Sequence, residues 1–191
     1  MDLPIGPDGR ARCWWAEDSA ALRDYHDQEW GRPVHDEVAL FEKLCLEGFQ
    51  AGLSWRTILD KRPAFRAAFA GFDPERLAGF GDAEVADLLT DARIVRHRGK
   101  IEATITNARR YLELVEEQGS LARFVWRFAE HDAPAPRSRA EVRTCSPASR
   151  AMADALRGRG WRFVGPTTAY AFQQAMGLVD DHLVGCAWRR G

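Results

Sequence analysis

Two pairs of residues that commonly bind metal ions lie near opposite ends of the chain. His182 and Cys186 are four residues apart, so a helix over this segment would place both side chains on one face. Cys13 and His26 lie near the other terminus and complete a set of two cysteines and two histidines, which suits tetrahedral zinc. Such an ion would join the two ends of the chain and have a structural role. The spacing is not that of a zinc finger, so free thiols and ordinary histidines are the alternative.

Aromatic residues are concentrated in the first third of the chain, at Trp14, Trp15, Tyr25, Trp30 and Trp55. Seven tryptophans are many for 191 residues, and aromatic faces can stack on a flat ligand such as a nucleobase. A tryptophan-rich core is the alternative. Glu47 lies near them in sequence, and helical geometry places it roughly 120° from the neighbouring apolar stripe, which predicts a solvated carboxylate.

Residues 146–177 have the pattern of two helices joined by a tight turn. Ser146 suits the N-cap of the first helix, Thr167 suits that of the second, and Gly177 suits its end. Backbone N–H groups at Gly165 and at the start of the second helix would then be available to bind a phosphate group. An ordinary helical hairpin packed into the core is the alternative.

The most basic segment is 93–110, which carries six arginines and lysines, including Arg98 and Lys100, against the single acid Glu102. Because the net charge of the whole chain is −1, nucleic-acid binding would depend on local patches of this kind. The segment is a candidate for DNA contact, and a solvated helix face is the alternative.

Apolar residues recur at helical spacing along most of the chain, and no convincing alternation at period two is visible. The sequence therefore predicts an all-α fold. We expect helices at 36–46 and at about 56–69, 73–79, 82–91, 98–117, 120–130, 148–158 and 167–176.

The chain is expected to form one domain, 1–191, with four parts. The terminal segments 1–35 and 178–191 are tethered by the metal, and residues 1–11 are expected to be loosely ordered. Residues 36–130 form a central helical lobe, 131–147 form a proline-containing linker, and 148–177 form the helix-hairpin-helix.

Composition points to an ordinary globular protein, with 46% hydrophobic and 29% charged residues. The longest apolar stretches are shorter than the roughly 18 residues that span a membrane, and the N-terminus lacks the apolar core of a secretory signal. We therefore expect no membrane association, a cytoplasmic location and a monomer. Four cysteines without framework spacing indicate thiols or metal ligands rather than disulfides.

Several long motifs resemble the 3-methyladenine DNA glycosylase I family, in order and over nearly the whole chain: YHDQEWG at 25–31, FEKLCLEGFQAGLSW at 41–55, RHRGKI at 96–101, FVGPTTAYAF at 163–172 and DHLVGC at 181–186. The resemblance implies a two-lobed, all-helical helix-hairpin-helix glycosylase with its pocket between the lobes. It also implies that one zinc ion is bound by Cys13, His26, His182 and Cys186.

In this resemblance, Glu47 contacts the extruded base and is the candidate catalytic residue. Tyr25, Trp30 and Trp55, and more loosely Trp15, form the aromatic pocket. Phe49 departs from the family, since some members carry a polar residue there, and this departure concerns the edge of the pocket.

The implied reaction suits these residue types. A damaged base must be flipped out of double-stranded DNA, and adenine alkylated at N3 is a cation that aromatic faces attract. Because this cation is already a good leaving group, water can attack C1′ and leave an abasic site and free 3-methyladenine. No lysine nucleophile is evident, which predicts a monofunctional enzyme. A zinc-stabilised damage-binding protein without hydrolytic activity is the alternative, and a catalytic zinc is disfavoured because four protein ligands leave no open position.

Asp180 presents a separate question. In the wider helix-hairpin-helix superfamily a catalytic aspartate occupies a similar segment, and VDDH at 179–182 matches it, whereas 3-methyladenine glycosylases often carry asparagine there. We expect a structural role, in which Asp180 caps a helix that bears His182 and Cys186.

Overall fold

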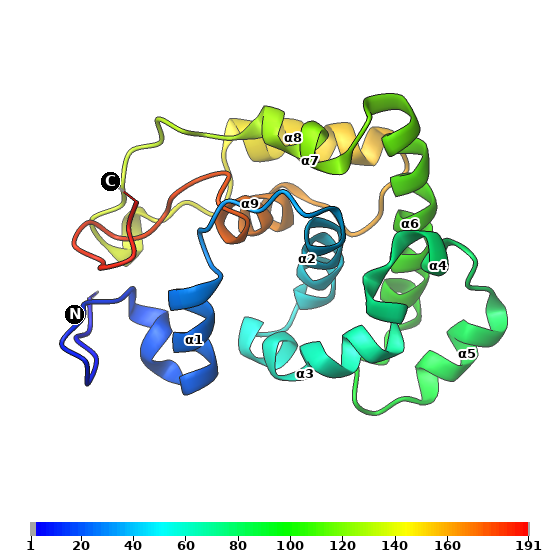
Figure 1. Ribbon diagram of the computed structural model, residues 1–191, viewed down its shortest axis with the longest axis horizontal. Coiled ribbons are helices and arrows are strands. Elements are labelled where there is room, and N and C mark those ends of the chain that lie inside the picture. Colours follow the sequence, from blue (N-terminus) through cyan, green and yellow to red (C-terminus); the bar gives the residue numbers. More distant parts are fainter. Residues whose placement is uncertain (1–2, 191) are drawn as a thin grey trace.

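The computed structural model describes residues 3–190, so residues 1, 2 and 191 of the predicted terminal segments lie outside it. The fold is all-helical, as expected (Figure 1). The α helices are α1 (Ala20–Gln28), α2 (Glu37–Gln50), α3 (Trp55–Ala68), α4 (Pro74–Ala78), α5 (Asp82–Thr90), α6 (Arg98–Gln118), α7 (Leu121–Val125), α8 (Pro147–Gly158) and α9 (Pro166–Ala175). Short 3-10 helices are η1 (Trp14–Asp18), η2 (Ala70–Phe72), η3 (Trp126–Phe128) and η4 (Arg139–Glu141).

Helix α2 lies at the centre of the molecule, with α3 on one side and α7, α8 and α9 on the other (Figure 1). The main core contains buried residues from every α helix between α2 and α9. Ten consecutive residues of α2, 40–49, are buried, and three of them are charged. A helix that is buried on all sides must satisfy such charges internally.

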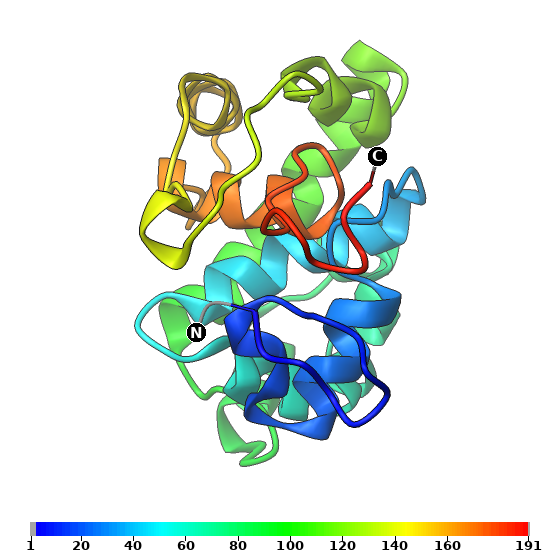
Figure 2. The same ribbon diagram turned by 90° about the vertical axis from the view of Figure 1, so that its left-hand side faces the viewer.

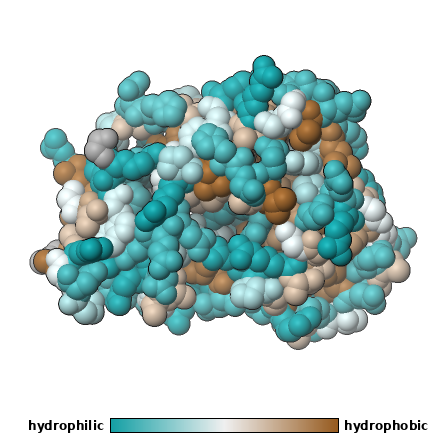
Figure 3. Space-filling model, viewed as in Figure 1, coloured by the Kyte–Doolittle hydropathy of each residue, from teal (hydrophilic) through white to brown (hydrophobic). Residues whose placement is uncertain are grey.

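The two ends of the chain lie on the same side of the molecule, next to α1 (Figures 1 and 2). Buried Cys13, Leu183 and Cys186 form a small apolar cluster there, separate from the main core. The outer surface in the view of Figure 3 is mostly hydrophilic, with small separate hydrophobic areas. None of the helices within 3–190 is both long and apolar enough to cross a membrane.

Most predicted helices are present, because side-chain caps fix where they begin. Asp36, Ser54, Ser120 and Ser146 each accept a hydrogen bond from a backbone N–H in the first turn of the following helix. The predicted cap at Thr167 is wrong. Helix α9 already begins at Pro166, with Gly165 at the N-cap and no side-chain cap.

Three other local predictions differ from the structure. Helix α1 was not predicted, although it carries Tyr25 and His26. Residues 178–186 are not helical, so His182 and Cys186 belong to irregular chain rather than to one helix face. Residues 3–11 fold back on themselves through an Ile5–Ala11 bridge, instead of being loosely ordered.

Arg12 holds this N-terminal turn in place. Its guanidinium is 2% exposed and pairs with Asp8 at 2.6 Å and with Asp27 at 2.8 Å. Because Asp27 belongs to α1, the ion pairs attach the N-terminal turn to that helix. A buried arginine needs such partners, and this tertiary requirement is not visible in local sequence.

Candidate active site and metal centre

A cavity of about 700 Å³ opens between α1, the ends of α2 and α3, and the segment that follows α9. Its walls include all five residues that the resemblance assigned to a base pocket: Trp15, Tyr25, Trp30, Glu47 and Trp55. The wall also contains Trp14, Gln174, Asp181 and Val142, the last from the predicted linker. The volume suits a small-molecule or nucleobase site whose walls combine aromatic and polar residues.

The aromatic side chains that line the cavity pack against each other. The Trp15 and Trp30 rings meet edge to face with centroids 5.2 Å apart, and the Tyr25 and Trp55 centroids are 5.3 Å apart. Tyr25 is 4% exposed, while the three tryptophans are partly exposed. Mutual packing restricts their rotamers, so the cavity keeps its shape without a ligand.

Glu47 is buried, which corrects the prediction of a solvated carboxylate. Its side chain is 5% exposed, and its Oε1 lies 2.8 Å from Nζ of Lys43, one helical turn earlier on α2. The same Nζ donates to the Tyr25 hydroxyl at 2.8 Å. The sequence analysis missed Lys43, although its i, i+4 spacing from Glu47 is the signal that would have indicated a pair.

Asp181 is a second carboxylate in the cavity wall and was also missed. It is 3% exposed, and its Oδ2 accepts hydrogen bonds from the Tyr170 hydroxyl at 2.5 Å and from Nε2 of Gln174 at 2.8 Å. Its Oδ1 forms no hydrogen bond with any residue in 3–190. Both donors belong to α9, so the carboxylate is fixed by that helix.

Asp180 points to a different place and does not line the cavity. Its Oδ1 lies 2.8 Å from Nδ1 of His182 and accepts from the His182 backbone N–H at 3.2 Å. The predicted helix cap is therefore wrong because no helix begins there, although the hydrogen bond to His182 exists. Burial is the largest single influence and opposes ionisation of Asp180. The hydrogen bond and charge of His182, together with the backbone N–H groups of His182 and Arg190, outweigh it and lower the pKa of the carboxyl.

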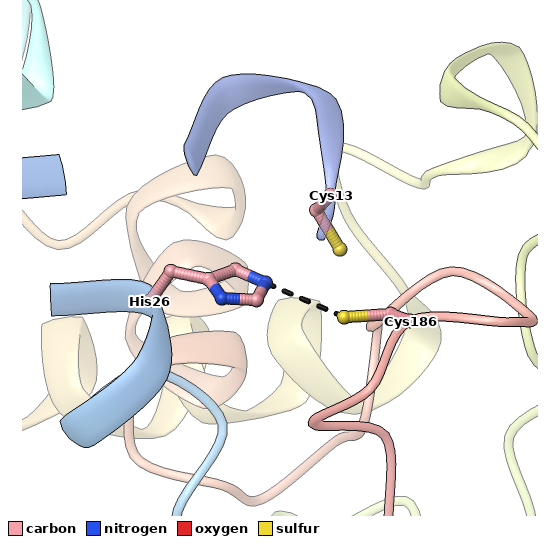
Figure 4. A group of neighbouring side chains, drawn as sticks. All are labelled: Cys13, His26 and Cys186. Carbon is pink, nitrogen blue, oxygen red and sulfur yellow. Dashed lines mark hydrogen bonds between the residues drawn. The ribbon is translucent and has the colours of Figure 1, made fainter. Parts of the chain in front are cut away.

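Three of the four predicted metal ligands form a compact group. The ligand atoms of Cys13, His26 and Cys186 lie within 4.8 Å of one another, and all three residues are buried. Figure 4 shows the side chains pointing toward one another from the N-terminal segment, α1 and the C-terminal segment. Sγ of Cys186 is 3.5 Å from Nε2 of His26, and tetrahedral zinc bonds of about 2.0–2.3 Å separate ligand atoms by about 3.3–3.8 Å.

The two thiols of this group differ in proton affinity. Hydrogen bonding from the Cys13 thiol, assisted by His26, lowers the pKa of Cys186 to about 4, while the pKa of Cys13 is raised. One thiolate is thus favoured even without an ion, and a thiolate is the form of cysteine that binds metals.

His182 stands beside the group with an orphaned ligand atom. Its ring centroid is 5.1 Å from that of His26, and its Nε2 is buried without a hydrogen-bond partner in the described residues. Asp180 holds its Nδ1, as Asp27 holds Nδ1 of His26 at 2.9 Å. This is the arrangement in which outer carboxylates orient metal-binding histidines, so the donor set fits a zinc ion.

The predicted DNA-contact residues are in contrasting environments. Gly165 has open space around its Cα, and Thr167 and Arg98 are exposed. Lys100 is 7% exposed, and its ammonium donates to the carbonyls of Phe49 at 2.9 Å and Ala51 at 2.6 Å. Lys100 therefore caps the C-terminal end of α2 instead of reaching a phosphate, and it is removed from the DNA-contact set.

Phe49 also lies away from the cavity. Its ring is 1% exposed and packs against Phe65, with centroids 4.7 Å apart. The departure at this position therefore affects the core, and the concern about the edge of the pocket is withdrawn.

Comparison with known proteins gives consistent matches over almost the whole chain. Residues 15–190 match the family model described as methyladenine glycosylase. The chain is 47% identical to DNA-3-methyladenine glycosylase 1 of Escherichia coli strain K12, over 92% of this chain and 95% of that protein.

Solved structures agree with this match. A crystal structure of a 3-methyladenine DNA glycosylase I superposes with a TM-score of 0.90 at 46% identity, covering 94% of this chain and all of the other. The Staphylococcus aureus enzyme, solved to explain 3-methyladenine recognition, superposes with a TM-score of 0.89 at 34% identity, covering 94% and 97%.

Proposed function

Because this chain belongs to the methyladenine glycosylase family, we propose that its aromatic cavity receives N3-alkylated adenine flipped out of double-stranded DNA. The protein is a DNA-3-methyladenine glycosylase of base excision repair, which hydrolyses the N-glycosidic bond. The observation that carries the site assignment is the convergence of five aromatic and acidic residues, assigned in advance, on one cavity.

Base recognition combines stacking with hydrogen bonding. Trp30 and Trp55 offer faces to the purine, and a cationic base gains additional attraction from such faces when water is excluded. Glu47 has Oε2 free of hydrogen bonds to residues 3–190, since Lys43 pairs with Oε1. We assign Oε2 as the acceptor for N–H groups at the edge of the base.

The bond-breaking step moves charge from the base to the sugar. The C1′–N9 bond breaks with its electron pair on the base, so the cationic adenine leaves as neutral 3-methyladenine. Positive charge develops on the sugar, water adds to C1′, and the water loses a proton. Asp181 supports this step as a fixed, buried carboxylate in the cavity wall, fastened to α9 by Tyr170 and Gln174.

We assign contact with the DNA backbone to the loop 159–165 and to the start of α9. The first backbone N–H groups of α9 have no intrahelical acceptor and bind anions well, and Gly165 leaves space for a phosphate to approach. Exposed Thr167 and Arg98 are assigned to the same contact surface. The proposal includes a two-lobed fold in which the helix-hairpin-helix contacts the DNA.

A single zinc ion is assigned to Cys13, His26 and Cys186, with His182 as the fourth ligand. The ion would supply folding stability and no chemistry to the reaction, because four protein ligands leave no open position. It would connect the chain ends beside Trp15 and Trp30, two walls of the cavity. A cytoplasmic location and a monomeric state are further parts of the proposal.

The test is release of free bases from methylated double-stranded DNA, separated by chromatography. We expect 3-methyladenine and an abasic strand that is not cleaved by the protein itself. Under single-turnover conditions, tight binding of methylated DNA with no base release would instead support the damage-binding alternative.

A further inference from the structure

Lys43 is a cation placed behind three walls of the base pocket without lining the pocket itself. Its Nζ lies 2.8 Å from Oε1 of Glu47, 2.8 Å from the Tyr25 hydroxyl and 3.3 Å from the centroid of the Trp55 ring. Lys43 is 5% exposed. One ammonium therefore contacts three residues that the proposed function assigns to the base.

These contacts use the whole hydrogen-bonding capacity of the ammonium. A lysine has three N–H donors, and here they face a carboxylate, a hydroxyl and an aromatic ring. Because Lys43 donates to Tyr25, the phenolic oxygen acts as acceptor and its own O–H is left to point elsewhere. Lys43 therefore acts through its neighbours and has no free position from which to touch a ligand.

The ammonium also changes the charge that a ligand meets. Glu47 alone would give the pocket a negative charge, and Lys43 cancels it from behind. The ammonium on one face of Trp55 likewise draws π-electron density away from the opposite face, which weakens attraction of a cation there. Both effects reduce the preference of the pocket for a positively charged base.

This charge balance bears on the reaction because the base loses its positive charge as the bond breaks. A pocket with net negative charge would stabilise the cationic base in the ground state more than in the transition state, and such binding does not accelerate the chemical step. Compensation of the Glu47 charge by Lys43 reduces this loss and still leaves Oε2 of Glu47 to recognise the base.

We propose that Lys43 is a positioning and specificity-determining residue, which holds Glu47, Tyr25 and Trp55 in place and compensates the charge of Glu47 in the base pocket. The pocket then discriminates less between a cationic adenine and the neutral base that it becomes than it would with an uncompensated Glu47. The proposal rests on the proposed function, since it takes the cavity to be the base pocket.

The test compares two small ligands of nearly equal shape but different charge. The fixed cation 3,9-dimethyladeninium imitates the substrate base, with a methyl group in place of the sugar, and 3-methyladenine is the neutral product. Calorimetric titration of both gives an affinity ratio that reports the charge of the pocket. Lys43→Met removes the charge and keeps the length of the side chain.

In the wild type we expect only a modest preference for the cation. In Lys43→Met the ratio should shift toward the cation by about tenfold or more, given an effective dielectric of about 20 at separations of a few ångströms. The single-turnover rate of excision should fall, without weaker binding of methylated DNA. The double variant Lys43→Met with Glu47→Gln removes both charges, so its ratio should return toward that of the wild type.

A purely structural role makes a different prediction. Both ligands would then lose affinity in parallel, the ratio would not change, and the double variant would restore nothing; this result would overturn the proposal. If Lys43→Met does not fold, Lys43→Gln, which keeps donors for Tyr25 and Glu47, gives the same comparison. Base release from methylated DNA by the wild type is measured separately, so failure of the proposed function is distinguished from failure of this inference.

Discussion

The proposed metal centre and the proposed base cavity are neighbours that use carboxylates in opposite ways. At the metal centre, Asp27 and Asp180 face histidine rings and orient them. In the cavity, Glu47 and Asp181 line the space that a ligand would occupy. Asp180 and Asp181 are adjacent in sequence yet belong to different sites, because an extended chain directs successive side chains to opposite sides.

The two sites also differ in the parts of the chain that supply their residues. Both cysteines of the proposed metal centre come from the terminal segments, whereas Glu47 and its partner Lys43 come from a central helix. Cys13 and Cys186 come from irregular terminal segments, which a small apolar cluster and a few hydrogen bonds, such as that from the Ala187 N–H to the Ala11 carbonyl, hold together. Glu47 and Lys43 share the central helix α2. Loss of the metal should therefore affect stability first, and changes in the cavity should affect binding and chemistry first.

The largest expected effect is that of Cys186→Ala. The variant should lose the metal, and its free energy of unfolding should fall by several kcal/mol, because structural zinc contributes directly to folding. Metal analysis of the purified protein, followed by thermal unfolding, measures both quantities. Cys145→Ala, at a cysteine outside the metal group, is the matched control. Wild-type melting of a metal-free sample would contradict the assignment.

The next effect is that of Glu47→Ala, which leaves the Lys43 ammonium buried without its carboxylate. Removal of one partner from a buried ion pair costs about 3–5 kcal/mol, so chemical denaturation should show a clear loss of stability as well as loss of base binding. Glu47→Gln keeps an oxygen beside Lys43 and should be less damaging to the fold. Equal stability of Glu47→Ala and the wild type would show that the pair is unimportant.

Trp55→Ala should weaken binding of free 3-methyladenine by roughly 1–3 kcal/mol, the usual contribution of a stacking face. Fluorescence or calorimetric titration measures this change. Trp126→Ala, at a partly exposed tryptophan that does not line the cavity, is the control for general loss of an indole. Wild-type affinity in Trp55→Ala would remove this residue from the pocket.

Substitutions of Asp181 and Asp180 should have opposite effects on the excision rate and on metal binding. Asp181→Asn should slow single-turnover excision by about tenfold or more, equivalent to about 1.4 kcal/mol in the barrier, with metal content unchanged. Asp180→Asn should change excision by less than about tenfold but should weaken metal binding, since loss of an outer-shell carboxylate typically costs 10–100-fold in affinity. The reverse pattern would exchange the two assignments.

The smallest effects concern the basic segment. Arg98→Ala should weaken DNA binding modestly and lower the slope of log affinity against log salt by about one, as expected for one phosphate contact. Lys100→Met should leave the salt slope unchanged and lower stability, because it removes the cap from α2. A change in salt slope for Lys100→Met alone would restore that lysine to the DNA-contact set.

Local chemistry in the sequence determined most of the helices, because the cues are contained within a few residues. Ser146 followed by Pro147, for example, defines the start of α8 through one side-chain bond and one fixed φ angle. The cue of a hydroxyl cap at Thr167 placed the start of α9 one residue too late. Pro166 suits the first position of a helix, so the helix already begins there, with Gly165 at the N-cap.

The candidate pocket residues were predicted only through resemblance in several separated motifs, whereas the four candidate metal ligands could also be picked out by residue type. Their surroundings were decided by tertiary structure. Helical periodicity placed Glu47 in solvent, since a wheel treats one helix in isolation, whereas α2 is packed on all sides and Glu47 meets Lys43, Tyr25 and the cavity. Lys100 appeared to be a free cation for a similar reason, because the α2 carbonyls that hold it lie about fifty residues away in the chain.

The sequence by itself thus determined most of the helical segments, although not α1, and the residue types that are available for metal binding and base recognition. Only the tertiary structure decided that Asp181 rather than Asp180 lines the cavity, and that Lys43 lies behind it. The physical reason is that capping and periodicity act over one or two turns, whereas burial of a charge depends on every segment that surrounds it.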